Sequence, residues 1–167
     1  MSDELQTTIW GLVVFLPLAL NLATHRRVDA VGLSGLLVLI WTLSRLFWLF
    51  DSPPGSMEWY APVDFIAGVT CFTVWKQGRQ FWKLALTATF ATQVALHTAF
   101  WAAWTQLGGW GGGFEADTLL WRYVALNNLL FVMQIVCAIS PGGRHVAVRT
   151  IARVSGRVRR HRHAGAR

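Results

Sequence analysis

Charged residues are scarce in this sequence, and the composition by itself is consistent with a membrane protein or with a soluble all-helical protein. Lys, Arg, Asp and Glu make up 14% of the 167 residues, whereas ordinary soluble domains carry about 25%. Hydrophobic residues make up 54%, and ten of the residues are tryptophans. The apolar residues gather into five runs that carry almost no charge: Thr8–Ala23, Val31–Phe50, Tyr60–Trp75, Leu84–Trp104 and Leu119–Ile139.

Cysteines and the common catalytic motifs are also scarce or absent. Cys71 and Cys137 form no CxxC pair, which argues against a thiol redox pair or a zinc site built on cysteine, and we expect no disulfide. The sequence contains neither an HExxH zinc motif nor a GxSxG nucleophile motif. We therefore predict a protein that is not an enzyme and needs no cofactor and no metal. An intramembrane enzyme using Asp64 and His97 is the remaining enzymatic alternative.

The lengths of the five runs indicate membrane-spanning helices. Each run holds about 15–21 residues, close to the roughly 20 that a helix needs to cross about 30 Å of hydrocarbon. Aromatic residues mark the ends of the runs, as expected at the level of the lipid headgroups: Trp10, Trp48, Trp59, Tyr60, Trp75, Trp82, Trp101, Trp104 and Trp121. The predicted fold class is all-α, a polytopic helical bundle with five transmembrane helices.

Charges between the runs alternate in sign, and this alternation predicts the orientation. Acidic residues lie before the first run, after the second and after the fourth: Asp3, Glu4, Asp51, Glu58, Glu115 and Asp117. The other links carry cations, with Asp29 as the exception: Arg26, Arg27, Lys76, Arg79 and Lys83. Because Lys and Arg collect on the cytoplasmic side, we expect the N-terminus outside and the C-terminus inside a bacterial inner membrane. The first run has an acidic N-terminal flank, which is typical of an uncleaved anchor rather than a signal peptide.

The chain divides into a transmembrane domain, residues 1–141, and an arginine-rich cytoplasmic tail, residues 142–167. The tail holds eight arginines and no acid, so the rest of the chain sums to −1 out of a total of +7. We expect the last span to stop at residues 140–143 and the tail to form an amphipathic interfacial helix on anionic lipid. Nucleic acid is the less favoured partner, because the tail has no aromatic residue to stack on bases. The basic face comprises Arg149, Arg153, Arg157, Arg159 and Arg160.

Four ionisable residues fall at a similar depth in the outer half of the predicted spans: Arg45, Asp64, His97 and Arg122. Ionisable groups inside a membrane are costly and usually face the bundle interior. We therefore predict that Asp64 pairs with Arg45 or Arg122 and that His97 lines the same pocket. The structural alternative is that both arginines extend to the headgroups, while Asp64 in a first helical turn is stabilised by the helix dipole.

Uncharged polar residues form stripes on the last two runs. Thr89, Gln93 and His97 repeat at i, i+4 and i+8, so they share one helix face. On the fifth run the corresponding residues are Tyr123, Asn127 and Gln134, with Asn128 beside them. Such stripes favour interhelical hydrogen bonds. A hydrophilic path through the membrane is the functional alternative, and the inner half supplies few polar residues for one.

The polar residues within the last three runs resemble those of small multi-pass membrane proteins of unknown function from bacterial viruses and prophages. The resemblance covers Trp59–Ile139 and lies in Val63-Asp64-Phe65, in Gln93-Val94-Ala95-Leu96-His97, and in Tyr123, Asn127-Asn128-Leu129 and Met133-Gln134. It implies a host-envelope protein and transfers no catalytic residue. Five predicted spans differ from the one to three of most holins.

Two functions from different classes are consistent with these patterns. The first is a non-enzymatic inner-membrane protein that acts through helix contacts with a partner or with further copies of itself, as an envelope or phage-related accessory or modulator. The second is a small ion or proton channel or transporter that uses the outer-half polar cluster. The small loops and the polar stripes favour the first, and the ionisable residues at one depth favour the second.

Overall fold

The computed structural model describes residues 3–24, 28–50 and 57–164, with side chains described for residues 7–24, 28–47, 59–109 and 111–141. Apart from the short links between the helices, these residues are helical, which confirms the all-α part of the predicted fold class. The elements in chain order are α1 (Asp3–Thr24), α2 (Val28–Phe50), α3 (Met57–Gly78), α4 (Phe81–Gln106), the short 3₁₀ turn η1 (Gly109–Gly111) and α5 (Gly113–Ala164).

Three of the helices are long and apolar enough to cross a membrane by themselves. The apolar segments are Thr7–Thr24 in α1, Val28–Phe47 in α2 and Gly113–Pro141 in α5. Each of the five predicted runs lies inside one of the helices, and the helices extend beyond the runs. The third helix, whose apolar run covers only Tyr60–Trp75, has 22 residues.

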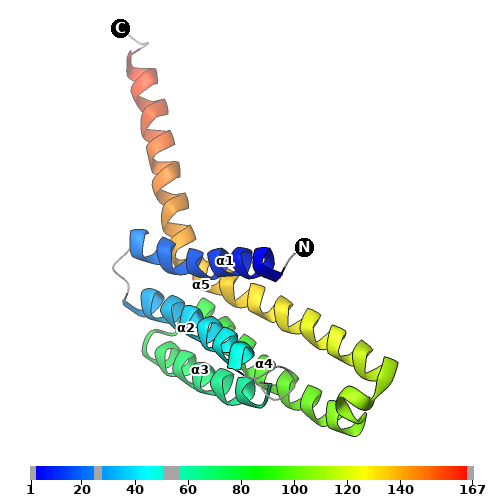
Figure 1. The fold of residues 1–167 in the computed structure, drawn as a ribbon. Coiled ribbons are helices and arrows are strands. Elements are labelled where there is room, and N and C mark those ends of the chain that lie inside the picture. Colours follow the sequence, from blue (N-terminus) through cyan, green and yellow to red (C-terminus); the bar gives the residue numbers. More distant parts are fainter. Residues whose placement is uncertain (1–2, 25–27, 51–56, 165–167) are drawn as a thin grey trace.

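Helix α4 packs between α3 and α5, and α1 packs against α2 and α5 (Figure 1). Only Arg79 and Gln80 separate α3 from α4, so these helices form an antiparallel hairpin. Arg79 has a φ of 29°, and its N–H donates to the carbonyl of Trp75 at 2.6 Å. We call this end of the bundle, with Lys76, Arg79 and Lys83, the basic end.

At the opposite end, which carries Glu115 and Asp117 and which we call the acidic end, glycines allow a tight turn from α4 into α5. Gly108, Gly109 and Gly113 have φ values of 80°, 59° and 61°. A Cβ on Gly112 would lie 2.2 Å from the carbonyl oxygen of Leu107, so no other residue fits there. The turn returns the chain directly onto α4, and α5 then packs along it.

The predicted end of the last span is wrong. The helix stop expected at residues 140–143 is absent, because α5 continues through Pro141 to Ala164. Proline cannot donate to the carbonyl four residues earlier and its ring crowds that carbonyl, and Figure 1 shows the C-terminal part of α5 turning away from the bundle. Helix α3 begins at Met57, before the predicted run, and Pro62 lies inside it. Asp64 is therefore beyond the first turn, where the helix dipole acts most strongly.

Two apolar clusters flank the middle of the bundle. The first, the basic-end core, comprises Leu33, Leu37, Ile40, Ala67, Cys71, Leu86, Phe90 and Ala138. The second, the acidic-end core, comprises Phe100, Trp104, Ala116 and Tyr123. Along α4 the polar residues Gln93 and His97 lie between the two clusters, and both are buried. The candidate site is in this interval.

Candidate functional site

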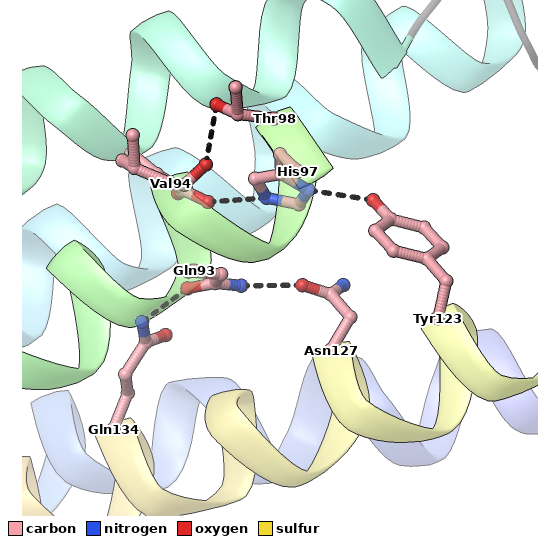
Figure 2. A network of polar contacts seen from close by, with 8 residues as sticks. Gln93, Val94, His97, Thr98, Tyr123, Asn127 and Gln134 are labelled. Atoms are coloured by element: carbon pink, nitrogen blue, oxygen red, sulfur yellow. Dashed lines mark hydrogen bonds and ion pairs between the residues drawn. The ribbon is translucent and has the colours of Figure 1, made fainter. Parts of the chain in front are cut away.

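Asp64, His97 and Tyr123 form a continuous hydrogen-bonded chain across three helices. The Nε2 atom of His97 on α4 lies 2.8 Å from Oδ2 of Asp64 on α3, and its Nδ1 atom lies 2.7 Å from the hydroxyl of Tyr123 on α5. Each residue is at most 5% exposed. Figure 2 shows Tyr123 reaching from α5 toward the His97 ring. By helix rise, the three residues lie about 10–15 Å from the acidic ends of their helices.

With Asp64 ionised, the proton arrangement in this chain has two forms, because a neutral imidazole has one donor and one acceptor while the cation has two donors. In the neutral form, Nε2–H donates to the Asp64 carboxylate and Nδ1 accepts the hydroxyl hydrogen of Tyr123. In the cationic form both ring nitrogens donate, so the Tyr123 oxygen accepts. The hydroxyl hydrogen of Tyr123 is then released for another acceptor.

A second polar group lies one helical turn closer to the basic end and joins α4 to α5. Gln93 Nε2 donates to Oδ1 of Asn127 at 2.8 Å, and Gln134 Nε2 donates to Oε1 of Gln93 at 2.5 Å. Figure 2 shows Gln93 between these two partners. Gln134 is 1% exposed, so its amide depends on this bond within the bundle. The stripe on α5 therefore meets the stripe on α4, whereas the Thr89 hydroxyl bonds to Leu86 of its own helix.

These polar groups line a cavity of about 570 Å³ between the helices. All five helices contribute to its wall, including Thr7 from α1 and Ser44 from α2. Aromatic rings form the apolar part of the wall: Trp10, Trp41, Tyr60, Phe131 and Tyr123. The volume is within the range of about 300–1,000 Å³ that is typical of small-molecule sites, and the mixed apolar and polar lining is also typical.

The two arginines of the predicted cluster have different positions. Arg45 lines the cavity, and its guanidinium carbon lies 5.8 Å from the centroid of the Trp41 ring. Arg122 is exposed on the surface of α5. The expected ion pair is absent: within the described part of the chain, Asp64 pairs with His97 and with neither arginine. Arg122 comes one residue before Tyr123, which faces His97. Consecutive residues of a helix are rotated by about 100° around its axis, so the Arg122 side chain points away from the cavity.

Sequence reasoning missed the part that Tyr60 plays in the site. Its hydroxyl donates to the backbone carbonyl of Ser44 at 3.4 Å, which links α3 to α2 beside Arg45. Its ring centroid lies 5.8 Å from that of His97. Tyr60 thus links the part of the cavity wall that carries Arg45 to His97. The sequence signal was ambiguous, since a tyrosine at the end of an apolar run is also typical of the headgroup region. Asn128, predicted to support the α5 stripe, lines the cavity.

A separate polar contact stabilises the basic end and explains the one charge that breaks the alternation. The ammonium of Lys83 on α4 lies 2.6 Å from Oδ2 of Asp29 at the start of α2, with side-chain exposures of 3% and 28%. Nearby, Asn21 Nδ2 donates to Oγ of Ser34 at 2.7 Å and to the carbonyl of Ala138 at 2.9 Å. These contacts and the basic-end core fill the bundle between the cavity and the basic end.

The remaining predicted residues lie elsewhere. Residues 142–164, with the predicted lipid-binding arginines Arg149, Arg153, Arg157, Arg159 and Arg160, are helical in backbone, and their side chains lie outside the described residues. No group of three or more His, Cys, Asp or Glu side chains suited to a metal ion occurs among the described residues. Comparisons of the chain with protein-family models, with curated proteins and with solved structures find no match.

Proposed function

We propose that this protein is a five-pass inner-membrane transporter or channel in which the central cavity accepts a small polar solute or ion and the Asp64–His97–Tyr123 chain handles a proton. The observation that carries the proposal is the cavity itself, about 570 Å³ in volume and lined by polar side chains from all five helices. Contact between the helices is sufficient to explain the hydrogen bonds of Gln93. It does not explain the cavity beside them, which a transport function requires.

The surfaces of α3 and α4 support five spans rather than three. Their 22 and 26 residues are sufficient to cross about 30 Å. Their hydropathy is reduced by Asp64, Gln93 and His97, all of which are buried. Large apolar side chains on α3, including Phe65, Ile66, Val69 and Phe72, are exposed instead. A helix with buried polar residues and exposed apolar ones suits a lipid environment.

The proposed orientation places the acidic end outside and the basic end inside, following the positive-inside rule. The C-terminal part of α5 turns away from the axes of the other helices (Figure 1), as a helix lying along the inner surface would. Its arginines would then contact anionic headgroups. The host-envelope location implied by the resemblance to small phage-encoded membrane proteins agrees with this arrangement.

The solute is expected to reach the cavity from the acidic end beside Arg45 of α2, because the acidic-end core closes the bundle there between α3, α4 and α5. The basic-end core and the Lys83–Asp29 ion pair close the other side. A transport cycle would have to separate α4 from α2 at the basic end.

Proteoliposomes test the proposal. Purified protein is reconstituted with a pH-sensitive dye inside, and proton flux is measured with and without an imposed gradient. We expect flux that is lost in His97→Ala and retained in Arg122→Gln, a matched substitution at an exposed ionisable residue of the outer half. If the unmodified protein neither passes protons nor binds small solutes, the transport proposal fails and the partner-contact function is favoured.

A further inference from the structure

The charges that line the cavity do not cancel within the described residues when His97 is protonated. The cationic His97 and the Asp64 carboxylate then neutralise each other at 2.8 Å. Arg45 remains, and among the described residues it makes neither an ion pair nor a hydrogen bond. An uncompensated guanidinium at the wall of a low-dielectric cavity favours a negatively charged occupant. The other lining residues are uncharged.

We propose that the cavity binds a small organic anion with a carboxylate group and that it binds this anion together with one proton. This inference rests on the proposed function and names the solute class. It assigns Arg45 as the anchor of the carboxylate and the Asp64–His97–Tyr123 chain as the site of the proton.

Arg45 has the geometry for an anchor. Its guanidinium lies against the Trp41 ring, 5.8 Å from the centroid, which limits its freedom through a cation–π contact. A guanidinium presents five N–H donors and binds a carboxylate with two parallel hydrogen bonds. The rings of Trp10, Trp41 and Phe131 line the same cavity and suit an apolar or aromatic body on the anion.

His97 couples the proton to the anion through Tyr123. When His97 is neutral, Tyr123 donates its hydroxyl hydrogen to Nδ1. When His97 is cationic, Nδ1–H donates to the Tyr123 oxygen, and the hydroxyl hydrogen is free to donate to an anion in the cavity. Protonation therefore adds a positive charge to the site and a hydrogen-bond donor beside it. Both effects strengthen the binding of an anion.

The groups that face His97 determine the direction of the pH dependence. The titratable or charged ones are Asp64 and Tyr60 from α3, Tyr123 from α5 and, across the cavity, Arg45 from α2. The lining residues of α1, Thr7 and Trp10, carry no charge. Protonation of His97 adds a positive charge beside the cavity, so anion affinity should rise as the pH falls, and binding should take up a proton.

Isothermal titration of the full-length protein in detergent with three probes of nearly equal shape tests the inference. The probes are benzoate, neutral benzamide and cationic benzamidine. We expect benzoate to bind at least about tenfold more tightly than either of the others at about pH 5.5 and to weaken at about pH 8. Arg45→Gln should lower benzoate affinity by about 10–100-fold, the range for a charge-assisted hydrogen bond. Arg122→Gln should bind benzoate like the unmodified protein.

The substitution Tyr123→Phe tests the coupling between His97 protonation and anion binding, and it leaves the Arg45 anchor unchanged. Phenylalanine retains the ring stacking on Phe100, where the centroids are 4.1 Å apart. We expect this variant to lose more benzoate affinity at about pH 5.5 than at about pH 8, because only the cationic His97 releases the Tyr123 hydroxyl hydrogen to the anion. Equal losses at both pH values would overturn the proposed coupling.

The unmodified protein alone can refute the anion inference, even if a variant fails to fold. Binding of the three probes with equal affinity, or preferential binding of benzamidine, overturns the anion inference and leaves the transport proposal intact. The same holds if none of the probes binds while His97-dependent proton flux persists. Absence of both binding and flux rejects the inference and the proposed function together.

Discussion

The ion pair between Lys83 and Asp29 provides a quantitative test of the packing at the basic end. Asp29→Asn removes the carboxylate and leaves the Lys83 ammonium, 3% exposed, without its counter-charge. Breaking a fully buried pair costs about 3–5 kcal/mol because one charge is stranded. Asp29 is 28% exposed, so water can reach part of the gap, and we expect a loss of about 2–3 kcal/mol in the free energy of unfolding. Lys83→Met combined with Asp29→Asn strands no charge and should recover most of this loss.

Detergent-induced unfolding followed by tryptophan fluorescence measures these differences, since ten tryptophans report on the bundle. Lys76→Met is the matched control: Lys76 lies at the same end of the bundle but is exposed, so its substitution should change stability by less than about 0.5 kcal/mol. If Asp29→Asn behaves like Lys76→Met, the pair does not stabilise the fold. The reasoning would also fail if the double variant were as unstable as the single one.

Three further predictions concern other parts of the chain. Gln93→Leu should lower the free energy of unfolding by about 2–3 kcal/mol in the same assay, because two interhelical bonds are lost and the buried Gln134 amide is stranded; an unchanged stability would contradict the assigned bonds. A single cysteine at Gly111, which has open space around it, should react with an impermeant reagent added to whole cells, whereas one at Gln77 should not; the reverse pattern would invert the topology. Amide exchange in the C-terminal part of α5 should be slower in anionic than in zwitterionic nanodiscs, and this difference should vanish after three tail substitutions to glutamine, at Arg149, Arg153 and Arg157.

The fold class was accessible from the sequence because it depends on composition and periodicity. Runs of apolar residues must be helical in lipid, where each backbone group needs an internal partner, and all five predicted runs lie within helices. The helix ends were less accessible. Pro141 and the two glycines after it indicated a stop, but a proline can remain inside a helix as a kink, and α5 continues through it.

The site was only partly predictable, because depth along a helix is a property of sequence while direction around the bundle depends on packing. Counting residues along the predicted spans is enough to assign Arg45, Asp64, His97 and Arg122 to a similar depth. Only the three-dimensional arrangement shows that Asp64 faces His97 and that Arg122 faces outward. The polar stripes on α4 and α5 were easier to pair with each other from the sequence, because the residues of each stripe share a single face of their helix. The Asp29 exception was visible as an anomaly, but its partner Lys83 lies 54 residues away and could not be assigned from the sequence.

Helix adhesion and ligand binding compete as explanations of the same polar residues, and Arg45 distinguishes them. Gln93, Asn127, Gln134 and the Asp64–His97–Tyr123 chain bond to one another, so each of these groups can be explained by the need to satisfy buried polar atoms. Arg45 makes no such bond within the described residues, although it lines the same cavity. In the five-pass membrane bundle proposed above, a charged group that stabilises no helix contact would be costly. Its presence is more simply explained by an occupant that brings the missing negative charge than by a role in the fold.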